Sequence, residues 1–261
     1  MVAGLLSGQR RDGGFGVHPY SKWKGAHWRL VSLVELGVPR TSGAARAAAE
    51  DVLAWIAAPA EPVVVARCER RHASMEGNAL IVCCRLGMAR DARARHLVEV
   101  LIRSQWPDGG WNCDIRPAAR RSSFHETLIP ILGLAEYHRA TGDRDALGAA
   151  ERGAELLLQH RVFRGRSDGA VIHPEWLNIH WPPYWHYDFF QGLRAIALVG
   201  KLDDSRAADA LERLRSLRRS DGTWRTGGRR YWTLRGPSNV EAVDWGDAHQ
   251  MVTPIALGIL G

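Results

Sequence analysis

The chain has 261 residues, 46% of them hydrophobic and 24% charged, and a formal net charge of +7. This composition is typical of globular proteins. The sequence contains no apolar stretch approaching the ~20 residues that a transmembrane helix needs. Without a basic leader or long apolar core at the N-terminus we expect no signal peptide, and the four cysteines lack the spaced framework of a secreted disulfide scaffold. These features predict a cytoplasmic protein.

Two kinds of helix are predicted to alternate along the chain. Apolar stretches that end near glycine are expected to form inner helices, and they occupy residues 25–37, 75–87, 122–134, 184–200 and 246–260. Amphipathic stretches rich in Arg and Ala, with apolar positions three and four apart, are expected to form outer helices at residues 41–58, 91–106, 145–160 and 204–219.

A turn signature recurs along the chain, as QRRDGGF at 9–15, QWPDGGW at 105–111 and RRSDGTW at 218–224. The Asp side chain can bond its own backbone and Gly can take a positive φ, so each copy predicts a tight turn that ends an outer helix. A second recurrence places His125 five residues before Pro130 and His249 five residues before Pro254. The recurrence of proline at one offset inside two inner helices indicates a shared packing geometry.

The segment QWPDGGW resembles the Q-x-x-D-G-x-W repeat of squalene and hopene cyclases, and the alternation of helices resembles the α/α toroid of the terpene cyclase and protein prenyltransferase superfamily. The resemblance implies an all-α fold in which about five helical hairpins form a toroid. Because the chain is short for this superfamily, we expect the ring to be incomplete. The whole chain, residues 1–261, is expected to form a single domain. It also implies that Gln105 and Trp111, with Gln9, Phe15 and Trp224, tie the barrel together.

The acidic motifs of this superfamily do not occur in the chain. The segments DWGD at 244–247 and LDDSR at 202–206 fit neither the D-x-D-D acid of class II cyclases nor the D-D-x-x-D magnesium motif. We therefore do not expect protonation of an alkene by a D-x-D-D acid, or magnesium diphosphate chemistry.

A zinc site is one expectation for the mouth of the toroid. Protein prenyltransferases bind zinc there through Asp, Cys and His at the starts of inner helices, and thiolate and imidazole are common zinc ligands. Cys68 and Cys113 precede inner helices, and histidines stand early in later ones, which gives the predicted ligands Cys68, Cys113, His125 and His186. The alternative is that the thiols are buried small residues and the histidines make ordinary hydrogen bonds. His72, His96, His138 and His160 are expected on outer or surface stretches.

Acid–base catalysis is the second expectation, with a histidine and a carboxylate from different repeats moving a proton. The candidate catalytic residues are His125, Glu126, His186, Asp188 and His249. Pairs such as His125 with Asp188, or Glu126 with His249, remain open.

Aromatic residues crowd the same end, most densely in HPEWLNIHWPPYWHYDFF at 173–190. They can build a hydrophobic pocket or belong to the barrel core. The predicted substrate-binding residues are His27, Trp28, His180, Trp181, Tyr184, Trp185, Tyr187, Phe190 and Trp245.

Together these features favour a terpene cyclase-like enzyme, a cyclase, transferase or lyase, acting on a largely apolar, isoprenoid-like small molecule. Arginine clusters such as Arg67, Arg70 and Arg71 make an anionic end of the substrate plausible, although they can simply solubilise the protein. No nucleic-acid-binding motif accompanies them. The alternative is a non-catalytic toroid that binds a ligand or a protein, and the short chain leaves a homodimer open.

Overall fold

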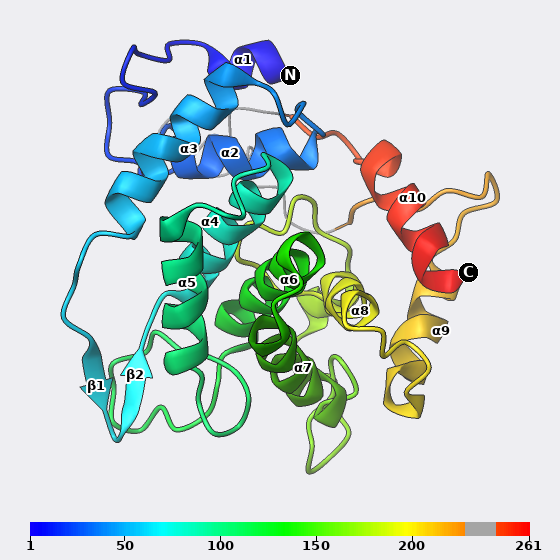
Figure 1. The fold of residues 1–261 in the computed structure, drawn as a ribbon. Coiled ribbons are helices and arrows are strands. Elements are labelled where there is room, and N and C mark those ends of the chain that lie inside the picture. Colours follow the sequence, from blue (N-terminus) through cyan, green and yellow to red (C-terminus); the bar gives the residue numbers. More distant parts are fainter. Residues whose placement is uncertain (228–243) are drawn as a thin grey trace.

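The computed structural model describes residues 1–227 and 244–261 as an all-α toroid (Figure 1). Neighbouring helices of the inner row pack in chain order, and they are α2 (Ala26–Glu35), α4 (Ala73–Arg85), α6 (Phe124–Thr141), α8 (Phe189–Leu198) and α10 (His249–Leu260). The outer row consists of α1 (Val2–Leu6), α3 (Gly43–Ile56), α5 (Ala92–Arg103), α7 (Arg144–Gln159) and α9 (Ala208–Ser216). The predicted alternation of inner and outer helices is confirmed.

Short elements complete the described part of the chain. The strands β1 (Val63–Val65) and β2 (Cys68–Arg70) form an antiparallel hairpin just before α4, in a stretch that the sequence predicts as irregular. Two 3₁₀ turns, η1 (Pro174–Leu177) and η2 (Ser205–Ala207), precede α8 and α9.

The two rows differ in how their side chains are buried. In α6 an unbroken run from Glu126 to Ala135 is buried, as expected for a helix surrounded by others. In α5 the residues Ala94, Leu97, Val98 and Leu101 are buried and recur three and four apart. This is the pattern of a helix with one solvent-exposed face.

The predicted turns close the outer helices through the same hydrogen bonds in different repeats. The Gln105 side chain donates from Nε2 to the carbonyls of Gly109 (2.7 Å) and Ala149 (2.9 Å), and Gln9 makes the equivalent pair in the first turn. Each glutamine thereby fastens its turn to the following outer helix.

The turn tryptophans cap the outer helix that precedes them. The indole Nε1 of Trp111 donates to the carbonyl of Leu101 at 2.9 Å, and that of Trp224 donates to Leu214 at 2.7 Å. Both rings are fully buried. These bonds satisfy carbonyls near the end of a helix that have no partner within it.

Helices α4 and α6 approach so closely that only glycine fits at their crossing. A Cβ on Gly77 would lie 2.7 Å from the carbonyl carbon of Ile129, and one on Gly133 would lie 2.8 Å from the carbonyl oxygen of Gly77. Pro130 lies inside α6 beside this contact, and Pro254 lies inside α10 as predicted. The crossing sets how far apart the first turns of α4 and α6 stand.

Candidate metal centre

His72, Cys113 and Glu126 come together at the N-terminal ends of α4 and α6. One ligand atom from each, a ring nitrogen, the Sγ and a carboxylate oxygen, lie within 4.8 Å of one another. His72 is the residue that precedes α4, Glu126 is in the first turn of α6, and Cys113 lies in the α5–α6 connection. Histidine, cysteine and carboxylate are all established zinc ligands.

Backbone hydrogen bonds hold the segments that carry these side chains. The amide of Arg71 donates to the carbonyl of Asn112 at 3.0 Å, which joins the residue before His72 to the residue before Cys113. The amide of Ser74 donates to Oε2 of Glu126 at 2.9 Å, which joins α4 to α6. The group is therefore fixed by the fold on each side.

Opposite charges favour an ionised pair within this group. Hydrogen bonds to Cys113 and Glu126 raise the pKa of His72 to about 10. Burial acts to raise the pKa of Glu126, but the hydrogen bonds from His72 and Ser74 outweigh it, so that pKa is lowered. The His72 Nδ1 lies 3.7 Å from Oε1 of Glu126, and the His72 side chain is 61% exposed. One side of the group is thus open and the other is buried.

A second carboxylate lies beside the group. Glu76 is buried on α4, four residues after His72, and its Oε1 accepts a 2.6 Å bond from Arg71. Burial raises the pKa of Glu76, Arg71 lowers it, and the charge of Glu126 raises it further. Its other oxygen, Oε2, is buried with no hydrogen-bond partner among the residues that the structure describes.

Of the four zinc ligands predicted from the sequence, Cys113 belongs to this group. Cys68 lies half-buried in β2. His125 and His186 contact each other with ring centroids 5.6 Å apart, and Nδ1 of His125 accepts from the amide of Tyr187 at 2.9 Å. Burial is the main reason that the pKa of His125 is lowered, which favours the neutral imidazole.

His72 is exposed, as expected for a surface stretch, but it directly precedes the inner helix α4 and is not among the ligands predicted from the sequence. Its position immediately before the predicted helix at 75–87 was the available signal. Glu76, at a spacing of four from His72, shares its helical face, but nothing in the sequence showed that it would be buried.

Different acid–base pairs form from those suggested by the sequence. Asp188 is fully buried, and its Oδ2 lies 3.2 Å from Nδ1 of His180. Burial lowers the pKa of His180, but the Asp188 carboxylate raises that pKa by more. His249 pairs with Asp247, with Nδ1 and Oδ1 2.7 Å apart. Glu126 pairs with His72, as described above.

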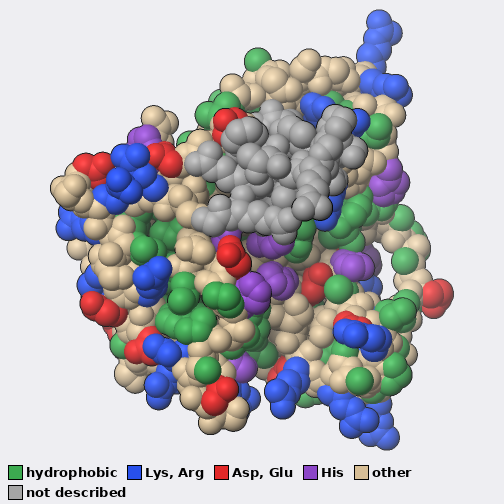
Figure 2. Space-filling model, turned by 180° about the vertical axis from the view of Figure 1, so that it is seen from behind, with side chains coloured by type: hydrophobic (Ala, Val, Ile, Leu, Met, Phe, Trp, Pro, Cys, Tyr) green, Lys and Arg blue, Asp and Glu red, His purple; other side chains and the backbone are tan. Residues whose placement is uncertain are grey.

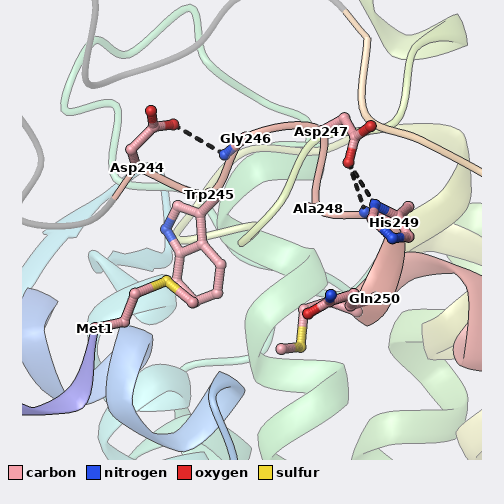
Figure 3. Close-up of a pocket in the computed structure, with 9 residues that line it drawn as sticks. Met1, Asp244, Trp245, Gly246, Asp247, Ala248, His249 and Gln250 are labelled. Carbon is pink, nitrogen blue, oxygen red and sulfur yellow. Dashed lines mark hydrogen bonds and ion pairs between the residues drawn. The ribbon is translucent and has the colours of Figure 1, made fainter.

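His249 and Trp245 also line a pocket of about 270 Å³ between Met1 and residues 244–251 (Figure 3). The Asp247 carboxylate lies beside the His249 ring, and Trp245 and Met1 lie away from this pair, on another part of the pocket lining (Figure 3). The first and last described segments of the chain therefore lie side by side at this point.

Most of the predicted substrate-binding aromatics are buried. Tyr184, Tyr187 and Phe190 are at most 1% exposed, and Trp28 is 2% exposed. The carbonyl of Tyr184 accepts a 2.7 Å bond from Asn78 of α4, and its hydroxyl lies 3.0 Å from Ser32 of α2. These contacts fix the 178–188 segment against the inner helices.

Trp181 and Trp185 belong to the 178–188 segment, and His27 packs against Trp28, whose ring contacts Trp185. The ring of Trp185 is 4.3 Å from that of His186, and Nζ of Lys22 lies 3.6 Å from its centroid. His27 is buried, and so is Trp181, with Arg194 over its ring at 5.4 Å. Histidine side chains gather near the middle of the face shown in Figure 2, beside acidic side chains.

Comparisons with known proteins show no family. No family model and no curated protein matches the chain. Among solved structures, the apo type II terpene cyclase MstE from Scytonema is similar at 14% identity with a TM-score of 0.34, over 99% of this chain and 94% of that one. No helix in the described residues is both long and apolar enough to cross a membrane.

Proposed function

We propose that the protein is a zinc-dependent enzyme with a terpene cyclase-like fold. It acts on a largely apolar small molecule at the mouth of the toroid that is formed by the N-terminal ends of the inner helices. The supporting observation is the convergence of His72, Cys113 and Glu126 from two inner helices and a connection. Three protein ligands with an open fourth position are typical of catalytic rather than structural zinc.

Two further observations support a catalytic zinc site. The unpartnered Oε2 of Glu76 is a buried carboxylate oxygen that lacks the compensating hydrogen bond such groups normally have, and a water bound to a nearby cation would donate one. The exposed side of His72 leaves a direction from which a substrate can arrive.

Each side chain has a defined part in this proposal. His72, Cys113 and Glu126 hold the ion, and zinc supplies a Lewis acid and a bound water of lowered pKa. Arg71 holds Glu76 by its Oε1, leaving Oε2 to accept or return a proton. Burial, Glu126 and Cys113 raise the pKa of Tyr20, so its hydroxyl stays protonated beside the group and can donate a hydrogen bond to a substrate oxygen.

Elemental analysis of protein purified without a histidine tag tests the zinc site. We expect about one zinc per chain, and its loss in His72→Ala and Cys113→Ser, because each removes one of three ligands. Cys68→Ser is the matched control, since this half-buried thiol lies outside the group, and it should retain the metal.

Two outcomes would contradict this assignment. Zinc lost in Cys68→Ser but kept in His72→Ala would return the site to the ligand set predicted from the sequence. If the wild-type protein contains no zinc and takes none up on titration, the alternative of a non-catalytic toroid that binds a ligand or a protein would be favoured. The identity of the substrate, its isoprenoid character and a homodimer remain predictions.

A further inference from the structure

A second pocket, distinct from the metal centre, is lined by arginines from two loops. Its volume is about 560 Å³, and the arginines are Arg120 and Arg121, from the segment before α6, and Arg166, from the loop after α7. His160, directly after α7, also lines the pocket. Two loops far apart in the sequence thus bring cationic side chains to one cavity.

These three guanidinium groups differ from the described arginines that a carboxylate holds. Arg116, which is close to them in sequence, is held by Asp114, and Arg206 is held by Glu155. The side chains of Arg120, Arg121 and Arg166 have no carboxylate partner in the described ranges 1–227 and 244–261. Their hydrogen-bond donors face water or a ligand.

The two carboxylates that line the pocket are engaged by their own loops. Asp108 accepts from the amide of Ser122 at 2.8 Å and from its hydroxyl at 2.5 Å. Asp168 accepts from the amide of Ala170 at 3.0 Å. The lining keeps a net positive charge, with three arginines against two aspartates.

The electrostatics of His160 agree with this concentration of charge. Burial lowers the pKa of His160, the hydrogen bond with the carbonyl of Arg164 raises it, and the guanidinium groups of Arg166 and Arg121 lower it further. These two guanidinium groups line the same pocket as the imidazole. An anion bound between them would be attracted by each.

The floor of the pocket is apolar. Phe124, Leu156 and Ile172 line it, and the Phe124 ring packs edge-on against His160 with centroids 5.0 Å apart. A ligand that combines a compact anion with a small apolar body would therefore match both halves of the cavity.

We infer that this pocket binds the phosphate group of a small phosphate ester whose apolar part rests on Phe124, Leu156 and Ile172. Guanidinium groups bind phosphate oxygens through paired, charge-assisted hydrogen bonds, and several of them converging suit a dianion better than a carboxylate. The inference is independent of the zinc proposal, because the two sites share no residue.

Calorimetric titration of the full chain with phenyl phosphate, inorganic phosphate and acetate tests the inference. Phenyl phosphate should bind more tightly than inorganic phosphate because of the apolar floor, and acetate should bind more weakly than either. Arg121→Gln and Arg166→Gln should each weaken phenyl phosphate binding ~10-fold, the effect of losing one charge-assisted hydrogen bond. Arg90→Gln, which removes one exposed arginine outside the pocket, should leave the affinity unchanged.

Ile172→Ser separates the two halves of the pocket. Ile172 is 39% exposed, so the variant should fold, and it should lose the preference for phenyl phosphate while keeping its affinity for inorganic phosphate. Equal weakening in Arg90→Gln, or no binding of phenyl phosphate to the wild type at millimolar concentration, would overturn the inference. Circular dichroism of each variant establishes that it is folded.

Discussion

His27 is buried in a neutral form among aromatic rings, and burial lowers its pKa to about 3. An exposed histidine in the unfolded chain keeps a pKa near 6.5. Between these two pKa values the unfolded state binds more protons than the folded state does, so the free energy of unfolding falls as the pH falls. The loss begins below the unfolded value and is ~3 kcal/mol by pH 4.

Replacing His27 by Gln should therefore flatten the acid side of the stability profile. Urea unfolding at pH 7 and at pH 4 measures the effect as the difference between the two free energies. That difference should shrink by most of the ~3 kcal/mol attributed to His27. His96→Gln, an exposed histidine on α5, is the control and should change the difference little. An unchanged pH dependence in His27→Gln would show that His27 takes up its proton without unfolding.

The candidate site shows which single residues the sequence can and cannot reveal. Cys113 and Glu126 were found because they stand beside a predicted inner helix with a repeat signature. His72 and Glu76 were missed because their surroundings depend on tertiary packing: Glu76 is buried, and His72 lies beside Glu126 of another helix. Pairing between His72 and Glu126 joins residues 54 positions apart, and helical periodicity contains no information about such a contact.

At the scale of elements, we expect the crossing of α4 and α6 to control the geometry of the candidate metal centre. A Cβ on Gly77 would meet the backbone of Ile129 and Pro130 at 2.7 and 2.8 Å, and backbone atoms cannot rotate away. Gly77→Ala should therefore push the helices apart and destabilise the fold by ~1–3 kcal/mol, the usual cost of overpacking. It should also weaken zinc binding, since His72 and Glu126 lie at the starts of these two helices.

Gly148→Ala is the matched control for this substitution. Gly148 lies in the outer helix α7, where the nearest side-chain atom to an added Cβ would be 3.6 Å away. The change should stabilise the protein by ~0.5–1 kcal/mol, because alanine restricts the unfolded chain more than glycine does. Urea midpoints and zinc titrations of both variants measure the two effects. Equal stability of Gly77→Ala and the wild type would mean that the crossing can relax.

The elements themselves were largely predictable, and the reason is local. Inner and outer helices differ in the width of their apolar face, and the turn signature marks where the outer helices α1, α5 and α9 end. The hairpin of β1 and β2 was not predicted, since three-residue strands are too short for a period of two to be recognised. The sequence could not decide whether the aromatic residues at 173–190 line a pocket or belong to the core, because both have the same pattern; the structure buries most of them.

At the scale of the whole molecule, we expect residues 1–261 to unfold as one domain. Each described inner helix packs on the next, so no helix of this row can leave without exposing its neighbour. Differential scanning calorimetry should show a single transition whose calorimetric and van't Hoff enthalpies agree. Two resolved transitions would divide the chain into separate folding units and contradict the single-domain prediction.

The candidate metal centre lies at the junction of two helical hairpins, with His72 from one and Glu126 from the next. A repeat taken alone would carry only part of the ligand set, so the capacity to hold an ion arises only when two copies are joined. Duplication of a hairpin during evolution would create a new junction of this kind each time. Substitutions at the starts of inner helices could then endow that junction with a chemistry of its own, while the turns and their tryptophans stay unchanged.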